Sequence, residues 1–239
     1  MSTQRIAVIG AGQMGNGIAH VFAQTGFPVT LIDVSTDALA KARQTISGNL
    51  DRQIKKGTID AAAKDATLGR LTDASSLDAV HDAALVIEAA TERPDLKFRI
   101  FGDLDRLAPA DAILASNTSS ISITQIAAKT TRPAQVVGMH FMNPVPVMQL
   151  VEVIRGHATS DETTAAVVAL AKQLGKTPVE ANDYPGFIAN RILMPMINEA
   201  VYCVMEGVGS VEAIDTVMKL GMNHPMGPLA LADFIGLDT

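Results

Sequence analysis

This chain of 239 residues has one cysteine, no long apolar run and no block of basic residues. Cys203 cannot form an internal disulfide, and its apolar, helix-like surroundings predict a packing role. No apolar stretch comes near the length of about 18 residues that a membrane helix needs, and the start lacks the basic-then-apolar pattern of a signal peptide. We therefore expect no membrane span, no secretion, and a reducing, cytoplasmic location. The net charge of −6 without a basic block argues against nucleic acid as a partner.

A glycine-rich sequence follows the first apolar run. The run Arg5–Ile9 favours a strand, and residues 16–24 favour a helix. Between them lie Gly10, Gly12, Gln13, Met14 and Gly15. Glycines at this spacing allow a tight turn, close approach of the backbone to a pyrophosphate, and close packing of helix on strand, while the helix N-terminus offers N–H groups to phosphates. The pattern predicts a dinucleotide site that includes these five residues.

Asp33 suggests which dinucleotide is bound. It ends the next apolar run, Val29–Ile32, where a βαβ unit places the acid that accepts hydrogen bonds from the adenosine ribose. The alternative interpretation is that Asp33 is a helix cap or turn residue. A carboxylate here repels a 2′-phosphate, and the next three residues include no arginine. We therefore predict NAD, not NADP, as the cofactor.

Strand-like and helical runs alternate up to about Asp183, the pattern of an α/β fold with a mostly parallel sheet. The expected strands are Arg5–Ile9, Val29–Ile32, Ala84–Glu88, Ala112–Ala115, Gln135–His140, Met148–Ile154 and Thr177–Glu180. A polar, helix-forming insertion is expected at about residues 36–64. The lysines of this insertion are expected to lie on a solvated helix face, with a helix end near Lys56 and Gly57. The alternative is that the insertion forms a lid that touches a phosphate-bearing substrate. We predict a Rossmann-like, doubly wound domain over residues 1–183.

From Tyr184 onward the strand pattern stops, and residues 187–206, 211–220 and 229–235 favour helices. A smaller all-α domain over residues 184–239 is therefore expected. It holds six of the eleven methionines and has few charges. A segment this short cannot close a core of its own, so its apolar surface must pack on the first domain or on another subunit. We infer an oligomer, most simply a homodimer.

A histidine and a glutamate are spaced to form a pair. His140 ends one apolar run and Glu152 lies in the next, with the Pro-rich turn that begins at Asn143 and Pro144 between them. The chain reverses there and can set the two side chains together. An imidazole held by a carboxylate can take up a proton near neutral pH, because the carboxylate fixes its tautomer and stabilises the imidazolium. A single histidine is more often structural than catalytic, so this remains a hypothesis at this point.

Several separate motifs, in order, make the chain similar to the short-chain L-3-hydroxyacyl-CoA dehydrogenase family, and within it to the bacterial 3-hydroxybutyryl-CoA dehydrogenases. The similarity runs from Arg5 to Thr239, and its landmarks are Val8–Gly17, Glu88–Glu92, Ser116–Ser120, His140–Glu152, Pro185–Arg191, Met218–Gly221 and Pro225–Pro228. The resemblance implies reversible oxidation of the 3-hydroxyl group of an acyl-CoA by NAD. Members of the family usually continue beyond this length with further helices, so we expect an incomplete second domain here.

The resemblance also implies roles for single residues. It makes His140 the general base and Glu152 its orienting partner. It places Ser119 near the substrate oxygen and the nicotinamide, although a helix-capping serine is the alternative, a role that Ser120 or Ser122 could also fill. Asn190 is expected beside the substrate carbonyl. We interpret it as a mid-helix residue, where asparagine is a poor helix former and a side chain directed toward the site is plausible.

Four further residues take binding roles from the resemblance. Asn143 is expected to contact the cofactor, with the start of an Asn-Pro turn as the alternative. Glu92 and Lys97 are expected near the nicotinamide ribose, with an ordinary surface ion pair as the competing interpretation. Lys56 is expected to reach the CoA moiety.

Three other functions remain open from the sequence. One is a dehydrogenase on the same scaffold that acts on a sugar acid or other hydroxy acid without CoA. A second is a β-hydroxyacid dehydrogenase with a lysine base, which also begins with a Gly-x-Gly-x-Met-Gly loop, but His140 and Glu152 supply the base here and argue against it. The third is a dinucleotide-binding sensor or structural protein without turnover. The joint presence of Ser119, His140, Glu152 and Asn190 argues against the third, because a protein that only binds needs no base with its own carboxylate.

Overall fold

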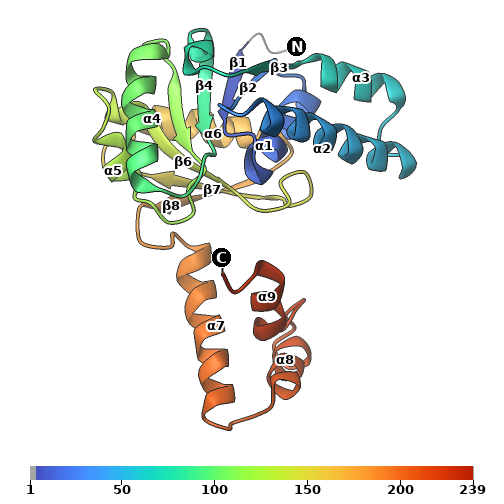
Figure 1. Cartoon of the computed structure of the whole chain (residues 1–239). Coiled ribbons are helices and arrows are strands. Elements are labelled where there is room, and N and C mark those ends of the chain that lie inside the picture. Colours follow the sequence, from blue (N-terminus) through green and yellow to red (C-terminus); the bar gives the residue numbers. More distant parts are fainter. Residues whose placement is uncertain (1–3, 239) are drawn as a thin grey trace. The chain divides into compact units, whose positions relative to one another are not determined.

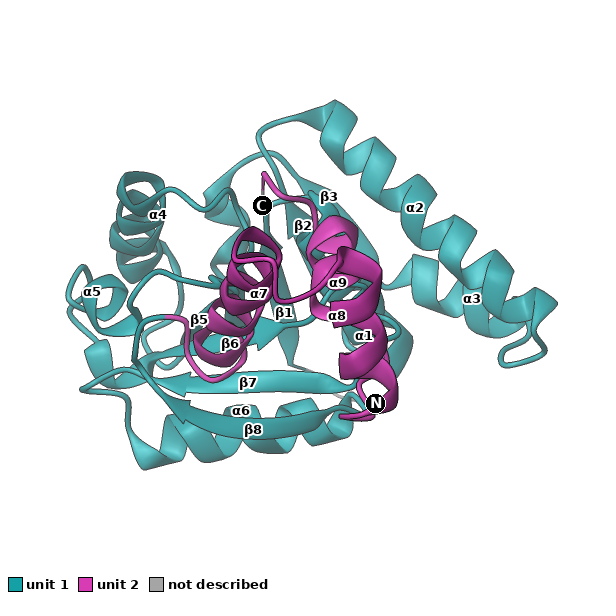
Figure 2. Cartoon of the chain, turned by 90° about the horizontal axis from the view of Figure 1, so that it is seen from below, with its two compact units in different colours: residues 1–185 teal, residues 186–239 magenta. Residues whose placement is uncertain are grey.

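The computed structural model describes residues 4–238 and divides the chain into two compact units (Figure 2). The first unit extends to Pro185 and contains one eight-stranded sheet flanked by helices, and the second begins at Gly186 and is helical. The expected fold class, an α/β domain followed by an all-α part, is confirmed. Among the residues described, none of the helices is both long and apolar enough to cross a membrane.

The sheet is mostly parallel. Its strands are β1 (Arg5–Ile9), β2 (Val29–Ile32), β3 (Leu71–Ala74), β4 (Ala83–Glu88), β5 (Ile113–Ser116), β6 (Val136–Phe141), β7 (Leu150–Arg155) and β8 (Thr177–Asn182). They lie in the order β3-β2-β1-β4-β5-β6-β7-β8, and only the β6–β7 pair is antiparallel. The expected strands are present with shifts of one or two residues at their ends. Strand β3 was not expected, because it is four residues long and two of them are exposed at the sheet edge.

Helices cover both faces of the sheet (Figure 1). They are α1 (Gln13–Thr25), α2 (Thr36–Lys55), α3 (Ala61–Gly69), α4 (Pro94–Leu107), α5 (Ile123–Ala127) and α6 (Asp161–Gln173), with short 3-10 helices at Leu77–Val80 and Pro133–Gln135. Four of these helices have an N-terminal capping residue whose side-chain oxygen accepts a backbone N–H of the first turn. The caps are Ser35, Asp60, Ser122 and Ser160. The helical insertion is two helices and not one. The first ends at Lys55, as expected, with Gly57 at φ 70°.

Side chains alternate between the two faces of each strand, which decides where functional groups point. Val137, Met139 and Phe141 of β6 belong to the core that also contains residues of α1 and α6. His140 lies between them in sequence, so its side chain points to the opposite face. That face is packed by α5: a Cβ on Gly138 would approach the Ile123 side chain to 3.0 Å. The histidine therefore lies on the α5 side of the sheet.

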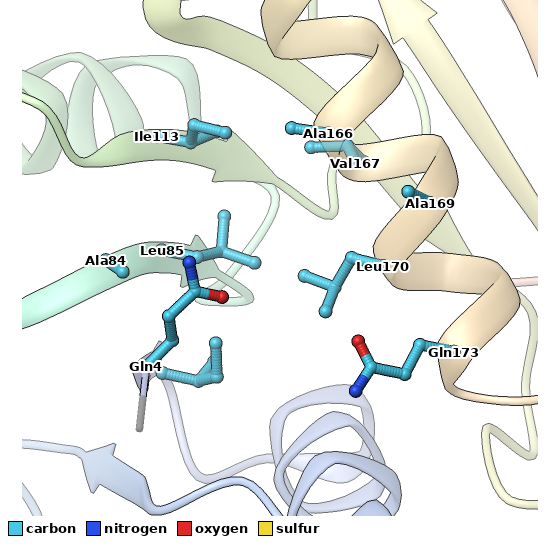
Figure 3. Close-up of a pocket in the computed structure, with 10 residues that line it drawn as sticks. Gln4, Ala84, Leu85, Ile113, Ala166, Val167, Ala169, Leu170 and Gln173 are labelled. Carbon is cyan, nitrogen blue, oxygen red and sulfur yellow. The ribbon is translucent and has the colours of Figure 1, made fainter. Parts of the chain in front are cut away.

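A cavity of about 300 Å³ lies between α6 and the amino ends of three strands (Figure 3). Its lining is apolar apart from two glutamines, and consists of Gln4, Ile6, Ala84, Leu85, Ile113, Ala166, Val167, Ala169, Leu170 and Gln173. In parallel α/β sheets, ligands bind at the carboxyl ends of the strands. This cavity lies at the other edge and carries no titratable group, so it is not the catalytic site.

The second unit consists of α7 (Ala189–Met205), α8 (Val211–Leu220) and α9 (Pro228–Ile235). The Asp215 carboxylate on α8 accepts the backbone N–H groups of Leu229 and Ala230, both at 2.9 Å, and so caps α9. The expectation that Asn190 lies mid-helix is wrong. The helix begins at Ala189, because Gly186 and Phe187 have positive φ and keep the preceding chain irregular, so Asn190 is in the first turn.

Candidate active site

The glycine loop joins β1 to α1, and its three glycines have different reasons to be glycine. Gly10 has φ 96°, and a Cβ there would lie 2.6 Å from the Ala89 carbonyl oxygen. A Cβ on Gly15 would lie 1.7 Å from the carbonyl oxygen of Gly10. A Cβ on Gly12 would meet nothing within 4 Å. The packing therefore requires the outer two glycines, whereas the middle one leaves open space beside the backbone, which would suit the close approach of a pyrophosphate.

Two further features of this loop suit a dinucleotide. Helix α1 starts without a side-chain cap and without an acidic residue in its first turn, so its N–H groups and positive dipole end suit a phosphate. Asp33, half-buried after β2, accepts the backbone N–H of Ala11 at 2.8 Å with one carboxylate oxygen and that of Ser35 at 2.9 Å with the other. Asp33 is not the cap of α2, since that role belongs to Ser35. It is a carboxylate fixed against the glycine loop.

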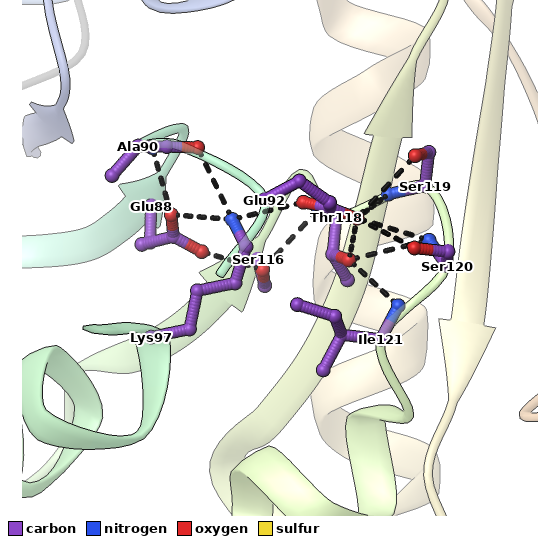
Figure 4. A network of polar contacts seen from close by, with 9 residues as sticks. All are labelled: Glu88, Ala90, Glu92, Lys97, Ser116, Thr118, Ser119, Ser120 and Ile121. Atoms are coloured by element: carbon purple, nitrogen blue, oxygen red, sulfur yellow. Dashed lines mark hydrogen bonds and ion pairs between the residues drawn. The ribbon is translucent and has the colours of Figure 1, made fainter. Parts of the chain in front are cut away.

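A buried ion pair lies at the end of β4 (Figure 4). The Lys97 ammonium donates to the Glu88 carboxylate at 2.7 Å, and the two side chains are 1% and 0% exposed. Glu88 also accepts the Ala90 backbone N–H and the Ser116 hydroxyl, each at 2.7 Å. The interpretation of Lys97 as part of an ordinary surface pair is therefore wrong, because its principal partner is a buried glutamate. Glu88 belongs to one of the family landmarks, Glu88–Glu92, but the sequence pattern assigned it no role of its own.

Glu92 connects this ion pair to the loop between β5 and α5, residues 117–122, which we call the serine loop. One of its carboxylate oxygens lies 3.3 Å from the Lys97 ammonium. The other accepts hydrogen bonds from the Thr118 hydroxyl, from the Ser119 backbone N–H at 2.9 Å and hydroxyl at 3.3 Å, and from the Ser120 backbone N–H at 3.1 Å. Burial alone would raise the pKa of Glu92, but the Thr118 hydrogen bond, the Lys97 charge and the Ser119 hydrogen bond together lower it. The structure thus brings Glu92, Lys97 and Ser119 together.

His140 and Glu152 face each other across the antiparallel β6–β7 pair, as direct register partners. His140 Nδ1 lies 2.8 Å from Glu152 Oε2, and the residues are 8% and 2% exposed. A carboxylate at Nδ1 accepts the proton held there, so the neutral ring carries its basic lone pair on Nε2. The reversal of the chain expected from the Pro-rich turn is therefore present, and it builds a buried His–carboxylate pair.

Lys176 stabilises the turn between these two strands by hydrogen bonds to its backbone. The Lys176 ammonium, 8% exposed, donates to the carbonyl oxygens of Val145 at 2.6 Å and Met148 at 2.7 Å. The Gln13 side chain donates to the Asn143 carbonyl oxygen Oδ1 at 3.1 Å, so the turn also reaches the glycine loop. No sequence pattern predicted the role of Lys176, because its partners are backbone atoms 28 and 31 residues away.

Asp183 fixes the start of α5, the helix that follows the serine loop. Its carboxylate accepts the backbone N–H groups of Ile123 at 3.0 Å and Thr124 at 2.8 Å, and the Ser122 hydroxyl at 2.6 Å. Burial would raise the pKa of Asp183, but these hydrogen bonds lower it. Ser122 is the cap of α5, so Ser119 is not needed for that purpose.

Three predicted site residues are not brought into these clusters. Lys56 is exposed at the C-terminal end of α2. Met14 is half-buried and packs against the core of the first unit. Asn190 belongs to the second unit, and its role stays a prediction. Among residues 4–238, no group of three or more His, Cys, Asp or Glu side chains is arranged to hold a metal ion.

Comparison with known families agrees with this geometry. The profile described as "3-hydroxyacyl-CoA dehydrogenase, NAD binding domain" matches residues 5–184, and the profile of the C-terminal domain of the same enzymes matches residues 186–239. The chain belongs to the 3-hydroxyacyl-CoA dehydrogenase family. The family's NAD-binding domain thus covers the glycine loop, Asp33 and the clusters at the ends of β4, β5 and β6.

Several individual relatives with high sequence identity are 3-hydroxybutyryl-CoA dehydrogenases. A probable 3-hydroxybutyryl-CoA dehydrogenase of Bacillus subtilis is 56% identical over 239 residues, which are 100% of this chain and 83% of the relative. The 3-hydroxybutyryl-CoA dehydrogenase of Bradyrhizobium diazoefficiens is 56% identical over 236 residues, 99% of this chain and 80% of the relative. The crystal structure of (S)-3-hydroxybutyryl-CoA dehydrogenase from Ralstonia eutropha has a TM-score of 0.97 and 53% identity, and the match covers 100% of this chain and 84% of that one. The chain is therefore an NAD-binding oxidoreductase of the 3-hydroxyacyl-CoA dehydrogenase family, and it is similar over its whole length to 3-hydroxybutyryl-CoA dehydrogenases.

Proposed function

We propose that this enzyme interconverts (S)-3-hydroxybutyryl-CoA and acetoacetyl-CoA, with His140 as the general base and Glu152 as its partner. The observation that carries the proposal is the 2.8 Å contact between His140 Nδ1 and Glu152 Oε2, with both residues buried. A structural histidine does not need a buried carboxylate of its own. A general base does, because the carboxylate fixes the tautomer and stabilises the imidazolium formed during turnover.

Each residue then has a role in the oxidation. NAD, when bound, supplies the acceptor for the hydride that leaves C3 of the substrate. His140 Nε2 takes the proton of the 3-hydroxyl group as that hydride leaves, and Glu152 stabilises the positive imidazolium. In the reverse direction, the same nitrogen returns the proton to the forming alkoxide. The Ser119 hydroxyl binds near the substrate oxygen and the nicotinamide, and the Asn190 amide binds the substrate carbonyl.

The cofactor and the CoA moiety use other parts of the fold. The pyrophosphate binds at the start of α1, to the loop that contains Gly10, Gly12, Gln13, Met14 and Gly15. Asp33 accepts hydrogen bonds from the adenosine ribose, and its negative charge disfavours the 2′-phosphate of NADP. Glu92, Lys97, Ser119 and Asn143 surround the nicotinamide half. Lys56, exposed at the end of α2, binds the CoA moiety as a cation toward its phosphates.

A homodimer is part of the proposal. The second unit exposes large apolar side chains, which supports a subunit contact there; examples are Ile192 at 64%, Val217 at 59%, Leu220 at 80% and Phe234 at 77% exposure. We place the reaction in the cytoplasm and in fatty-acid metabolism. Light scattering on the purified protein tests the oligomeric state, and a monodisperse monomer would remove this part of the proposal.

One assay separates the proposed reaction from its rivals. NADH oxidation is followed with acetoacetyl-CoA, with longer 3-oxoacyl-CoAs and with free acetoacetate in parallel, and NADPH replaces NADH in a matched series. We expect turnover with acetoacetyl-CoA and NADH, and little with free acetoacetate. Faster turnover of free oxo acids would favour the non-CoA hydroxy-acid dehydrogenase. Tight NADH binding without turnover of any of these compounds would favour a dinucleotide-binding sensor.

A further inference from the structure

The charged cluster at the ends of β4 and β5 is not neutral (Figure 4). It contains two carboxylates, Glu88 and Glu92, and one ammonium, Lys97. The ammonium lies 2.7 Å from Glu88 and 3.3 Å from Glu92. Because Glu88 and Lys97 are both almost completely buried and in direct contact, their charges compensate each other. The cluster therefore has a net charge of about −1, which is located on Glu92, whose side chain is 38% exposed.

This charge lies on the side of the sheet where one half of the cofactor is expected to bind. The strand order reverses between β1 and β4, and a dinucleotide binds across that point with one mononucleotide half on each side. Asp33 marks the adenosine half after β2, so the nicotinamide half belongs to the side of β4 and β5. Glu92 follows β4 and its carboxylate is bonded to the loop after β5. The oxidised nicotinamide ring carries a positive charge, and the reduced ring carries none.

We propose that the Glu92 carboxylate sets the relative affinity of the site for the two oxidation states of the cofactor, by favouring the positive ring of NAD⁺ over the neutral ring of NADH. Glu92 is then a specificity residue for the oxidation state, in addition to being a ligand of the serine loop. Its carboxylate is ionised near neutral pH, since the hydrogen bonds from Thr118 and Ser119 and the nearby ammonium keep its pKa low. Arg93, the next residue, is exposed, so water screens its opposing charge.

Two single substitutions separate the effect of the Glu92 charge from the effect of its hydrogen bonds to the loop after β5, which brace that loop. Glu92→Gln removes the charge but keeps an oxygen that accepts from Thr118, Ser119 and Ser120. Glu92→Asp keeps the charge but shortens the side chain, which weakens the same hydrogen bonds. Unit charges within about 10 Å of each other at a partly exposed site change a binding constant by about fivefold to tenfold. We expect Glu92→Gln to raise the ratio of the dissociation constants, Kd for NAD⁺ over Kd for NADH, by about that factor.

The test measures cofactor binding alone, without acyl-CoA, so it rests on NAD binding and not on the proposed proton transfer by His140. Kd for each oxidation state is measured by calorimetry, and for NADH also by fluorescence, for the unmodified enzyme and both variants. Asp111→Asn is the matched control, because Asp111 is exposed before the amino end of β5 and the change removes one negative charge. The control and Glu92→Asp are expected to keep the ratio within about twofold.

The outcomes are distinct. A higher ratio in Glu92→Gln alone supports the proposal, and a tenfold change corresponds to about 30 mV in the potential of the bound two-electron pair. An unchanged ratio, or equal weakening of both oxidation states in both variants, would mean that Glu92 acts only as a brace and would overturn it. If Glu92→Gln fails to fold by circular dichroism, Ser120→Lys replaces it. That change adds a cation at an exposed position beside Glu92 and is expected to raise the same ratio about threefold; no change would equally overturn the proposal.

Discussion

Replacement of Glu152 by glutamine is the most direct test of the proposed base. The carboxylate is 2% exposed and 2.8 Å from His140 Nδ1, so glutamine keeps the size of the side chain and removes its charge. In the proposed mechanism the imidazolium forms in a buried place, where water cannot take over the role of the lost negative charge. We expect a lower turnover number, because the lost interaction is with the proposed base. For the same reason, NADH binding should change little.

The magnitude follows from the strength of the lost interaction. A hydrogen bond to a charged partner contributes about 1.5–3 kcal/mol, and one between neutral groups about 0.5–1.5 kcal/mol. The difference of about 1–2 kcal/mol destabilises the imidazolium, and each 1.36 kcal/mol lowers a rate about tenfold. The turnover number should therefore fall by about fivefold to thirtyfold. An amide that turned its N–H group toward Nδ1 would also select the wrong tautomer and lower the rate further.

The assay is steady-state reduction of acetoacetyl-CoA at saturating NADH over a range of pH. His140→Gln is measured beside it, and removal of the base should lower turnover by about 10²–10⁴-fold. The double variant should be no slower than His140→Gln, because a partner without its base has nothing to stabilise. Glu180→Gln, at an exposed position of β8, is the control for loss of a negative charge. Full activity of Glu152→Gln at every pH, or additive effects in the double variant, would refute the coupled pair.

Three other predictions concern the cofactor, the turn and acid stability. Asp33→Ser combined with Val34→Arg should erode the preference for NADH over NADPH by at least about tenfold, measured as the ratio of kcat/KM, because repulsion of the 2′-phosphate is replaced by attraction. Lys176→Met should lower the free energy of unfolding by about 3 kcal/mol and raise KM for NADH, since two charge-assisted hydrogen bonds to the turn are lost, whereas exposed Lys172→Met should change neither. Burial lowers the pKa of His20 to about 4, so the unfolded chain takes up this proton first and stability should fall by about 3 kcal/mol as the pH drops from about 6.5 to about 4; urea melts of His20→Gln should lack that part of the loss.

Local sequence patterns predicted the parts of this molecule that local physics determines. The glycines after β1 follow from the requirements of a tight turn, and the chain between His140 and Glu152 is short enough for its reversal to be anticipated. Strand β3 was missed because an edge strand buries few side chains and carries little apolar signal. The partner of Lys97 could not be predicted, because Glu88 reaches it only when α4 packs beside β4.

The same limit applies to Lys176 and Asp183. Each acts on backbone atoms far away in sequence, and backbone atoms leave no trace in the residue types. Asn190 was misplaced within its helix because the irregular residues 186–188 delay the helix start. The family and its cofactor were predicted most completely, because several motifs in the same order are more specific than any single motif.

The buried Glu88–Lys97 pair also limits how this enzyme can evolve. Removing either partner alone leaves an unpaired charge in the interior and costs about 3–5 kcal/mol, a large part of the stability of a typical domain. Replacing both together with apolar side chains of similar size is often neutral or stabilising. Single substitutions at either position are therefore costly to stability, whereas the fold tolerates the double change, which also removes the lysine proposed to lie at the nicotinamide half. The two sites should therefore show strong epistasis in stability when a library of paired substitutions is measured.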